Sequence, residues 1–270
     1  MSNNSTTQKL YVRAQKFSAN KPFQTLLKRE ILRFSSLFSQ TIIAPLVTAS
    51  LYLLIFGVGL GKNLSILKEF SYLEFIIPGL ILMGLIRNSF ANSASSLFMA
   101  RYLGYISDFL TTPLKSYQMI LAYTIASLCR GFVVGICVLV VSLFFSPISW
   151  QHPFYALSIA FIAGFLFSQF GIIAALMSES FDHLNVFTNF IITPLIYLGG
   201  LFYPVSSLPG IWERISYANP LFYLIDAFRY GALGVYHVNP SLSLIVCLLV
   251  ALILFFTSIK LMNSPGRLRQ

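Results

Sequence analysis

The chain is poor in charged residues, and this scarcity excludes the ordinary water-soluble proteins. Asp, Glu, Lys and Arg together make up 10% of its 270 residues, against roughly 25% in soluble domains. Hydrophobic residues make up 57%, and the mean hydropathy is +0.78. We therefore expect an integral membrane protein with the lipid bilayer as its main surroundings.

Acidic residues are scarcer still, with 8 Asp and Glu against 18 Lys and Arg and a net charge of +10. Such an excess of positive charge can indicate nucleic-acid binding. Here, however, the basic residues cluster at the chain ends and in one central loop, as the topology of a multi-pass membrane protein requires. We expect no nucleic-acid partner.

The chain also lacks the motifs of metal and nucleotide chemistry. Its cysteines, Cys129, Cys137 and Cys247, have no CxxC spacing and no neighbouring His, which argues against a disulfide framework or a metal site. The run GVGLGK at 57–62 resembles a phosphate-binding loop, but Phe56 and Asn63 stand where that loop needs Gly and Ser or Thr. We expect no ATPase site, no metal and no cofactor on this chain.

What the chain has is apolar runs. A spanning helix needs about 20 predominantly apolar residues. Six stretches are predicted to span: 39–60, 74–98, 117–145, 154–177, 186–203 and 241–261. An even number of spans places both termini on one side, and the distribution of Lys and Arg makes that side the cytoplasm.

The segments at the two ends are polar or amphipathic. Residues 1–21, rich in Ser, Asn, Thr and Gln, are predicted to be a flexible cytoplasmic N-terminus, and 263–270 a cytoplasmic tail. From Pro22, apolar residues recur every three or four positions, with Lys28, Arg29 and Arg33 towards the other face. This pattern favours an amphipathic helix over 22–37 lying in the membrane surface, although a simple cap on the first span is the alternative.

Polar side chains inside the second and third spans are candidates for a translocation path. A charge at such depth should face the protein interior or a wet cavity. Close helix packing explains the uncharged members equally well. The candidates are Arg87, Asn88, Asn92 and Arg130.

The stretch 204–235 is apolar but broken by prolines and charges. Broken apolar backbone at membrane depth survives only where protein or a water-filled cavity satisfies its polar groups. We predict a re-entrant, outward-facing helical hairpin, in which the spacing of Asp226 and Arg229 permits an ion pair that either fixes the hairpin or contacts substrate. The gate candidates are Tyr203, Pro209, Trp212, Pro220, Tyr223, Asp226 and Arg229.

Residues 99–115 form the basic central loop. Helical periodicity there ends before Pro113, since a proline disfavours helix at the preceding residue. A short amphipathic helix held between two spans is suited to docking on a partner.

Several of these motifs, in this order, resemble the permease subunits of ABC-2 type transporters. The similar runs are YLGGLFYPVSSLP, NPLFYLIDAFRYGALG and the FLTTP that ends at Pro113. The runs FIIPGLILMGLIRNSFANSASSLF and ITPLIYLGGLFYP are more similar still to YadH-like bacterial inner-membrane permeases. The resemblance covers about residues 23–262, so that 22–262 is expected to be an ABC-2 transmembrane domain.

This resemblance implies an all-α membrane fold of the type V exporter kind, with 22–37 as a connecting helix and 99–115 as a coupling loop. It implies a homodimer in the bacterial inner membrane with two copies of a separate ABC ATPase, which binds the ATP and Mg. The expected substrate is amphipathic, lipid-like, polysaccharide or drug-like, and is exported. The coupling residues implied are Arg101, Tyr105, Asp108, Phe109, Leu110 and Pro113.

Two other functions fit a multi-pass membrane protein. An ion-coupled secondary transporter usually carries acidic residues inside its spans, and the sequence shows no such carboxylate. A membrane-embedded lipid-modifying enzyme could use Glu179, Asp182 and His183, or Asp226 and Arg229. Neither set offers a convergent nucleophile, base and orienting group.

Overall fold

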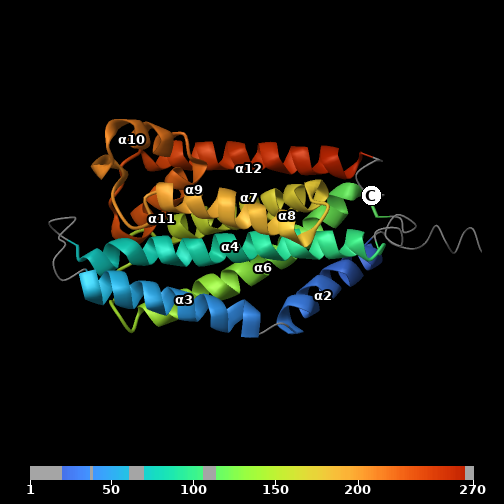
Figure 1. Cartoon of the computed structure of the whole chain (residues 1–270), viewed down its shortest axis with the longest axis horizontal. Coiled ribbons are helices and arrows are strands. Elements are labelled where there is room, and N and C mark those ends of the chain that lie inside the picture. Colours follow the sequence, from blue (N-terminus) through green and yellow to red (C-terminus); the bar gives the residue numbers. More distant parts are fainter. Residues whose placement is uncertain (1–19, 37–38, 61–69, 106–113, 265–270) are drawn as a thin grey trace, which may run out of the picture.

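The computed structural model describes residues 20–36, 39–60, 70–105 and 114–264. This part of the chain consists of helices joined by turns (Figure 1). The predicted all-α fold is confirmed. The predicted N-terminal segment, apart from its last two residues, and the tail from residue 265 lie outside the described residues.

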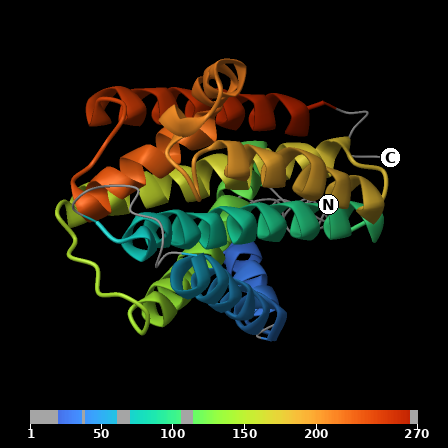
Figure 2. The same ribbon diagram turned by 60° about the vertical axis from the view of Figure 1, so that its left-hand side comes forward.

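Four helices are long and apolar enough to cross a membrane: α4 (Tyr72–Tyr102), α6 (Ser116–Ser142), α7 (Pro153–Met177) and α12 (Pro240–Met262). Each lies close to a predicted span. Helix α4 begins at a capping box, in which the Ser71 hydroxyl accepts from the Glu74 N–H and the Glu74 carboxylate accepts from the Ser71 N–H. It packs between α6 and α7, while α12 lies at the far edge of the bundle from α2 and α3 in both views (Figures 1 and 2).

Small residues let α4 and α7 touch. A Cβ built on Gly171 would lie 2.6 Å from the carbonyl oxygen of Phe90. No real side-chain carbon tolerates that distance, so the two backbones approach this closely only because residue 171 is glycine.

The first and fifth predicted spans are helical but contain π-helical turns. Residues 39–60 divide into η1 (Ser39–Ile43), α3 (Ala44–Tyr52) and η2 (Leu53–Leu60), and the fifth span into α8 (Phe181–Val186), η4 (Phe187–Ile192) and α9 (Thr193–Leu198). By length and composition, the described residues contain four spanning helices, or five if α2 and the helix after it count as one bent span. The count of six is not confirmed.

The fifth span ends earlier than the sequence predicts. Helix α9 stops at Leu198, and Gly200 turns the chain with a φ of +79°. A left-handed glycine ends a helix because it satisfies the last carbonyls without strain. The prediction of helix over 199–203 was therefore wrong.

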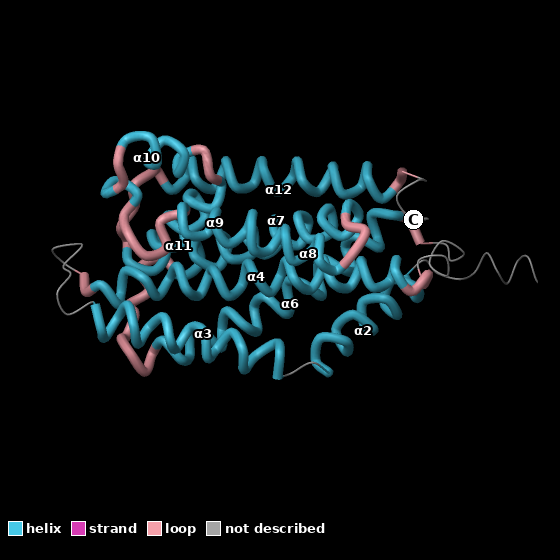
Figure 3. Tube along the Cα trace, viewed as in Figure 1, coloured by secondary structure: helices cyan, strands magenta, loops and turns pink. Residues whose placement is uncertain are grey.

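A helix, α2 (Asn20–Ser36), lies where the amphipathic pattern predicts one. Two further helices, α10 (Gly210–Tyr217) and α11 (Pro220–Leu233), follow the short 3-10 turn η5 (Val205–Ser207) within the stretch predicted to be a hairpin (Figure 3). Helix α11 is buried against α4, α7 and α12, whereas α10 exposes Ile211, Trp212 and Ile215. How α2 and the hairpin sit in a bilayer stays a prediction.

Candidate functional site

A cavity of about 300 Å³ lies between α3, α4 and η4. Two predicted path residues, Arg87 and Asn88, line it. Arg87 Nη2 donates to Thr193 Oγ1 at 3.0 Å. Asn88 Nδ2 donates to the Gly84 carbonyl one turn earlier, also at 3.0 Å, so this amide is bound within its own helix. The rest of the lining is mainly apolar and includes Leu80, Met83 and Tyr52.

Aromatic side chains lie beside the cavity towards the first turn of α4, and Tyr52 among them lines it. The Tyr52 and Tyr197 hydroxyls are 2.9 Å apart, and the Phe202 ring lies 5.3 Å from that of Tyr52 and 4.7 Å from that of Phe56. The Tyr72 hydroxyl fixes this end by donating to the Phe202 carbonyl at 2.9 Å. We name Tyr52, Phe56, Tyr197 and Phe202 the aromatic cluster.

Tyr203 is the one gate candidate from this neighbourhood. The Tyr203 hydroxyl donates to the Tyr197 carbonyl at 2.9 Å and so supports the aromatic cluster. The remaining rings were missed because aromatic residues are frequent throughout this chain. The signal that could have found them is the pair of glycines at 199–200, which turns the chain back over the end of α9.

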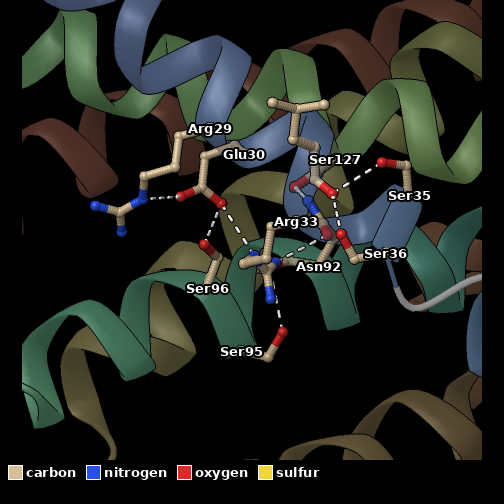
Figure 4. A network of polar contacts seen from close by, with 10 residues as sticks. Arg29, Glu30, Arg33, Ser35, Ser36, Asn92, Ser95, Ser96 and Ser127 are labelled. Carbon is tan, nitrogen blue, oxygen red and sulfur yellow. Dashed lines mark hydrogen bonds and ion pairs between the residues drawn. The ribbon is translucent and has the colours of Figure 1, made fainter.

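A buried polar network joins α2 to α4 and α6 at the opposite half of the bundle (Figure 4). Glu30, 0% exposed, accepts from the Ser96 hydroxyl and from Arg33 Nε at 3.2 Å. Arg33 Nη2 also donates to Asn92 Oδ1 at 3.0 Å, and Asn92 Nδ2 donates to Ser127 Oγ at 3.2 Å. Side chains from three helices therefore share one chain of polar contacts.

This network corrects one prediction and gives the contacts of another candidate. Arg33 was expected on the polar face of a surface helix, but it points into the bundle because Glu30 and Asn92 bind it there (Figure 4). Asn92, a candidate for the translocation path, accepts from Arg33 and donates to Ser127, and its place on such a path stays a prediction. Glu30 was missed, although a lone acid among basic and apolar residues is a signal for a buried ion pair.

The bundle also buries two carboxylates, neither of which lies in a predicted span. Glu30 packs against α4 inside the bundle, and Asp226 in α11 is buried as well. Both carboxylates have fixed partners in the described structure: Glu30 pairs with Arg33, and Asp226 accepts from two backbone N–H groups.

Arg130, the fourth path candidate, lies in the middle of α6 and does not line the cavity. Its Nε is buried and has no hydrogen-bond partner among the described residues. The structure therefore brings Arg87 and Asn88 together but separates them from Asn92 and Arg130.

Half of the coupling segment is described. Arg101, in the last turn of α4, donates through Nη1 to the Ala175 carbonyl and, at 3.3 Å, to that of Ser178. The exposed ring of Tyr105 lies 5.9 Å from the Arg29 guanidinium of α2. The other coupling candidates, Asp108, Phe109, Leu110 and Pro113, lie outside the described residues.

In the hairpin, Asp226 and Arg229 do not form the ion pair that their spacing allows. None of the ion pairs within 4 Å among the described residues joins these two side chains. Asp226 instead accepts from the N–H groups of His237 and Val238, at 3.0 Å each for Oδ2. Arg229 Nη2 donates to the Gly200 carbonyl at 2.8 Å, and its guanidinium lies 3.8 Å from the centroid of the Phe75 ring. Both side chains hold the hairpin, each through different partners.

The other hairpin candidates lie at the start of α10 and of α11 or within these two helices. Pro209 precedes α10, and Pro220 is the first residue of α11, where a missing N–H costs nothing. The Tyr223 hydroxyl donates to the Tyr217 carbonyl at 2.9 Å. Trp212 is half exposed and contributes to the apolar outer face of α10.

The described residues contain no group of three or more His, Cys, Asp or Glu that could hold a metal ion. His183 binds only locally, where its Nδ1 accepts from the Glu179 N–H at 3.4 Å. The chemistry that the site does offer is recognition: a cation and hydroxyls in an otherwise apolar cavity.

Comparison with known proteins gives a family and relatives. The family model described as ABC-2 type transporter matches residues 21–233. The chain is 38% identical to the inner membrane transport permease YadH of Escherichia coli (strain K12), over 90% of this chain and 95% of that protein. It is 23% identical to nodulation protein J of Rhizobium meliloti (strain 1021), over 87% of this chain and 90% of that protein.

Proposed function

This chain belongs to the ABC-2 type transporter family, and from that premise we propose that it is the membrane permease of an ATP-driven exporter. The observation that carries the proposal is the family match together with the similarity to an inner membrane transport permease along nearly the whole chain. The substrate class we propose is amphipathic: a lipid-like, polysaccharide or drug-like compound. We place the protein in the bacterial inner membrane.

ATP hydrolysis takes place on a different subunit in this proposal. Two permease chains form a homodimer, and two ABC ATPase subunits, which bind ATP and Mg, dock on residues 99–115 of each. The contacts of Arg101 and Tyr105 support this role, because they tie the start of that segment to α7 and α2. A movement imposed on the segment would thus reach three helices directly.

Each chain crosses the membrane six times in this account. At roughly 1.5 Å per residue, the helical stretches 39–60 and 181–198 extend about 33 Å and about 27 Å, close to the hydrocarbon thickness of about 30 Å. Both termini are then cytoplasmic. The hairpin of α10 and α11 lies on the outward side, re-enters the membrane and acts with the aromatic cluster as the exit gate.

Ion-coupled secondary transport is the competing function. Buried Glu30 and Asp226 give it carboxylates inside the bundle. Their contacts argue against proton cycling, because partners within the chain fix each carboxylate and neither residue lines the cavity that contains Arg87.

The test replaces Phe109 by Asp in the full chain, co-purified with its ATPase and reconstituted into liposomes. We expect the variant to reach the membrane but to lose both stimulation of ATP hydrolysis and transport. Ser107→Asp adds the same charge two residues away and serves as the control. Transport at the wild-type rate by the Phe109→Asp complex would contradict the coupling role, as would ATP hydrolysis by the purified permease alone.

A further inference from the structure

Arg87 is a cation without a counterion at the centre of the bundle. It is the central residue of α4, about 22 Å from either end. A guanidinium has five N–H donors, yet the hydrogen bond to Thr193 Oγ1 is the one that Arg87 makes with the described residues. None of them supplies a carboxylate within 4 Å of it. The free donors belong to a side chain that lines the cavity.

The described residues hold no spare carboxylate at this depth. Of the eight acidic residues in the sequence, Glu69 and Asp108 lie outside the described residues. Glu30 and Asp226 are committed to the partners described above. The other four belong to the ends of the bundle. Glu74 lies in the first turn of α4, Asp182 in the first turn of α8 and Glu213 in α10, and Glu179 follows Ser178, whose carbonyl accepts from Arg101 in the last turn of α4.

A second copy of the chain does not change this count. In a dimer whose copies share one orientation in the membrane, each acidic residue of the partner lies at the same depth as its counterpart. An unpaired charge at such a depth is costly. The anion that best completes the guanidinium therefore comes from outside the protein.

The walls of the cavity define the rest of the ligand. Met83 and Leu80 lie one and two turns from Arg87 on α4, and Pro45, Ala49 and Val138 add further apolar surface. About 300 Å³ is at the low end of the range for ligand sites. This space suits a head group and the first part of an apolar chain.

We propose that the Arg87 cavity binds the anionic group, a phosphate or a carboxylate, of an amphipathic molecule whose apolar part lies along Leu80 and Met83. Arg matches both groups with two parallel hydrogen bonds. Thr193 holds Nη2 in place for this pairing. The inference deepens the proposed function by naming the substrate's charge.

The test measures binding to the purified full-length permease in dodecyl maltoside. The probes are dodecyl phosphate, zwitterionic dodecylphosphocholine and inorganic phosphate. We expect dodecyl phosphate to bind wild type at least about tenfold more tightly than the other two, and Arg87→Gln to lose at least about tenfold of that affinity. Arg87→Lys, which keeps the charge, should retain most of it. Lys260→Gln, an exposed cation in the last turn of α12, is the matched control.

Arg87→Gln should fold, because it removes a charge that has no acidic partner; its melting temperature without ligand is expected to equal or exceed that of wild type. Equal affinity of wild type and Arg87→Gln for dodecyl phosphate would overturn the proposal. So would equal binding of dodecyl phosphate and dodecylphosphocholine. If inorganic phosphate binds as tightly as dodecyl phosphate, the amphipathic ligand is wrong. These measurements need no ATPase, so their failure and the failure of the Phe109→Asp experiment are separate results.

Discussion

Replacing Glu30 by Gln is expected to lower the free energy of unfolding by about 2–4 kcal/mol. Removing one partner of a buried ion pair costs roughly 3–5 kcal/mol, because the other charge stays behind uncompensated. Here the Arg33 side chain keeps 26% of its surface exposed, and Asn92 still accepts from it, so the expected cost is shifted about 1 kcal/mol below that range. Glutamine keeps the shape of the side chain and removes only its charge.

A double-mutant cycle separates the pair from its surroundings. Glu30→Gln and Arg33→Gln together should destabilise by about 1–2 kcal/mol less than the sum of the single changes, since each single variant removes the same contact between the two side chains. Arg29 Nε stays 3.7 Å from Glu30 Oε1 in the Arg33→Gln variant, which keeps this difference small. Unfolding is followed by tryptophan fluorescence during SDS titration in dodecyl maltoside micelles. Glu179→Gln, an exposed carboxylate outside every ion pair of the described residues, is the control and should change stability by less than about 0.5 kcal/mol.

Additive single effects would refute the idea that Glu30 and Arg33 act as a pair. If the Glu30→Gln variant is as stable as the Glu179→Gln control, the polar network does not stabilise the packing of α2 on the bundle.

Three further predictions concern single contacts. Arg229→Lys should destabilise the chain by about 1–3 kcal/mol in the same titration, because lysine cannot both stack on Phe75 and reach the Gly200 carbonyl; the exposed Arg214→Lys should not. Gly171→Ala should cost about 1–3 kcal/mol by forcing α7 away from Phe90, whereas Gly210→Ala, whose Cβ meets open space, should change stability by less than about 0.5 kcal/mol. Phe202→Ala should open the aromatic cluster. In a cysteine-free chain that carries Thr48→Cys in the cavity, the thiol should then react faster with a membrane-impermeant reagent added outside. Equal labelling rates with and without the Phe202 ring would contradict its role as a barrier.

The long helices could be predicted from the sequence because each depends on a local pattern. Helices α7 and α12 are continuous apolar runs that begin at a proline, and their predicted and observed ends differ by at most one residue. The end of α9 could not be read in this way. Tyr197 to Tyr203 is uniformly apolar, and only the left-handed backbone of Gly200 turns that run into two segments.

The candidate site was predictable in its residue types but not in its contacts. Periodicity correctly placed charged and amide side chains inside α4, and the cavity contains Arg87 and Asn88. Periodicity could not show that Asn92, one turn after Asn88, faces α2. The contact depends on Arg33, which is 59 residues earlier in the chain and folds back against Asn92. For the same reason the spacing of Asp226 and Arg229 predicted a pair, while backbone groups from other elements bind each of them.

The central claim, that a separate ATPase drives this permease through residues 99–115, is tested most directly by site-specific photo-cross-linking. A photoreactive amino acid replaces Phe109 in the full chain, and the control replaces Phe144, which is 85% exposed at the other end of α6. The account predicts an adduct with an ABC ATPase subunit from position 109 and none from position 144. A chain that reaches the membrane and exports its substrate, yet gives no ATPase adduct from position 109, would contradict it.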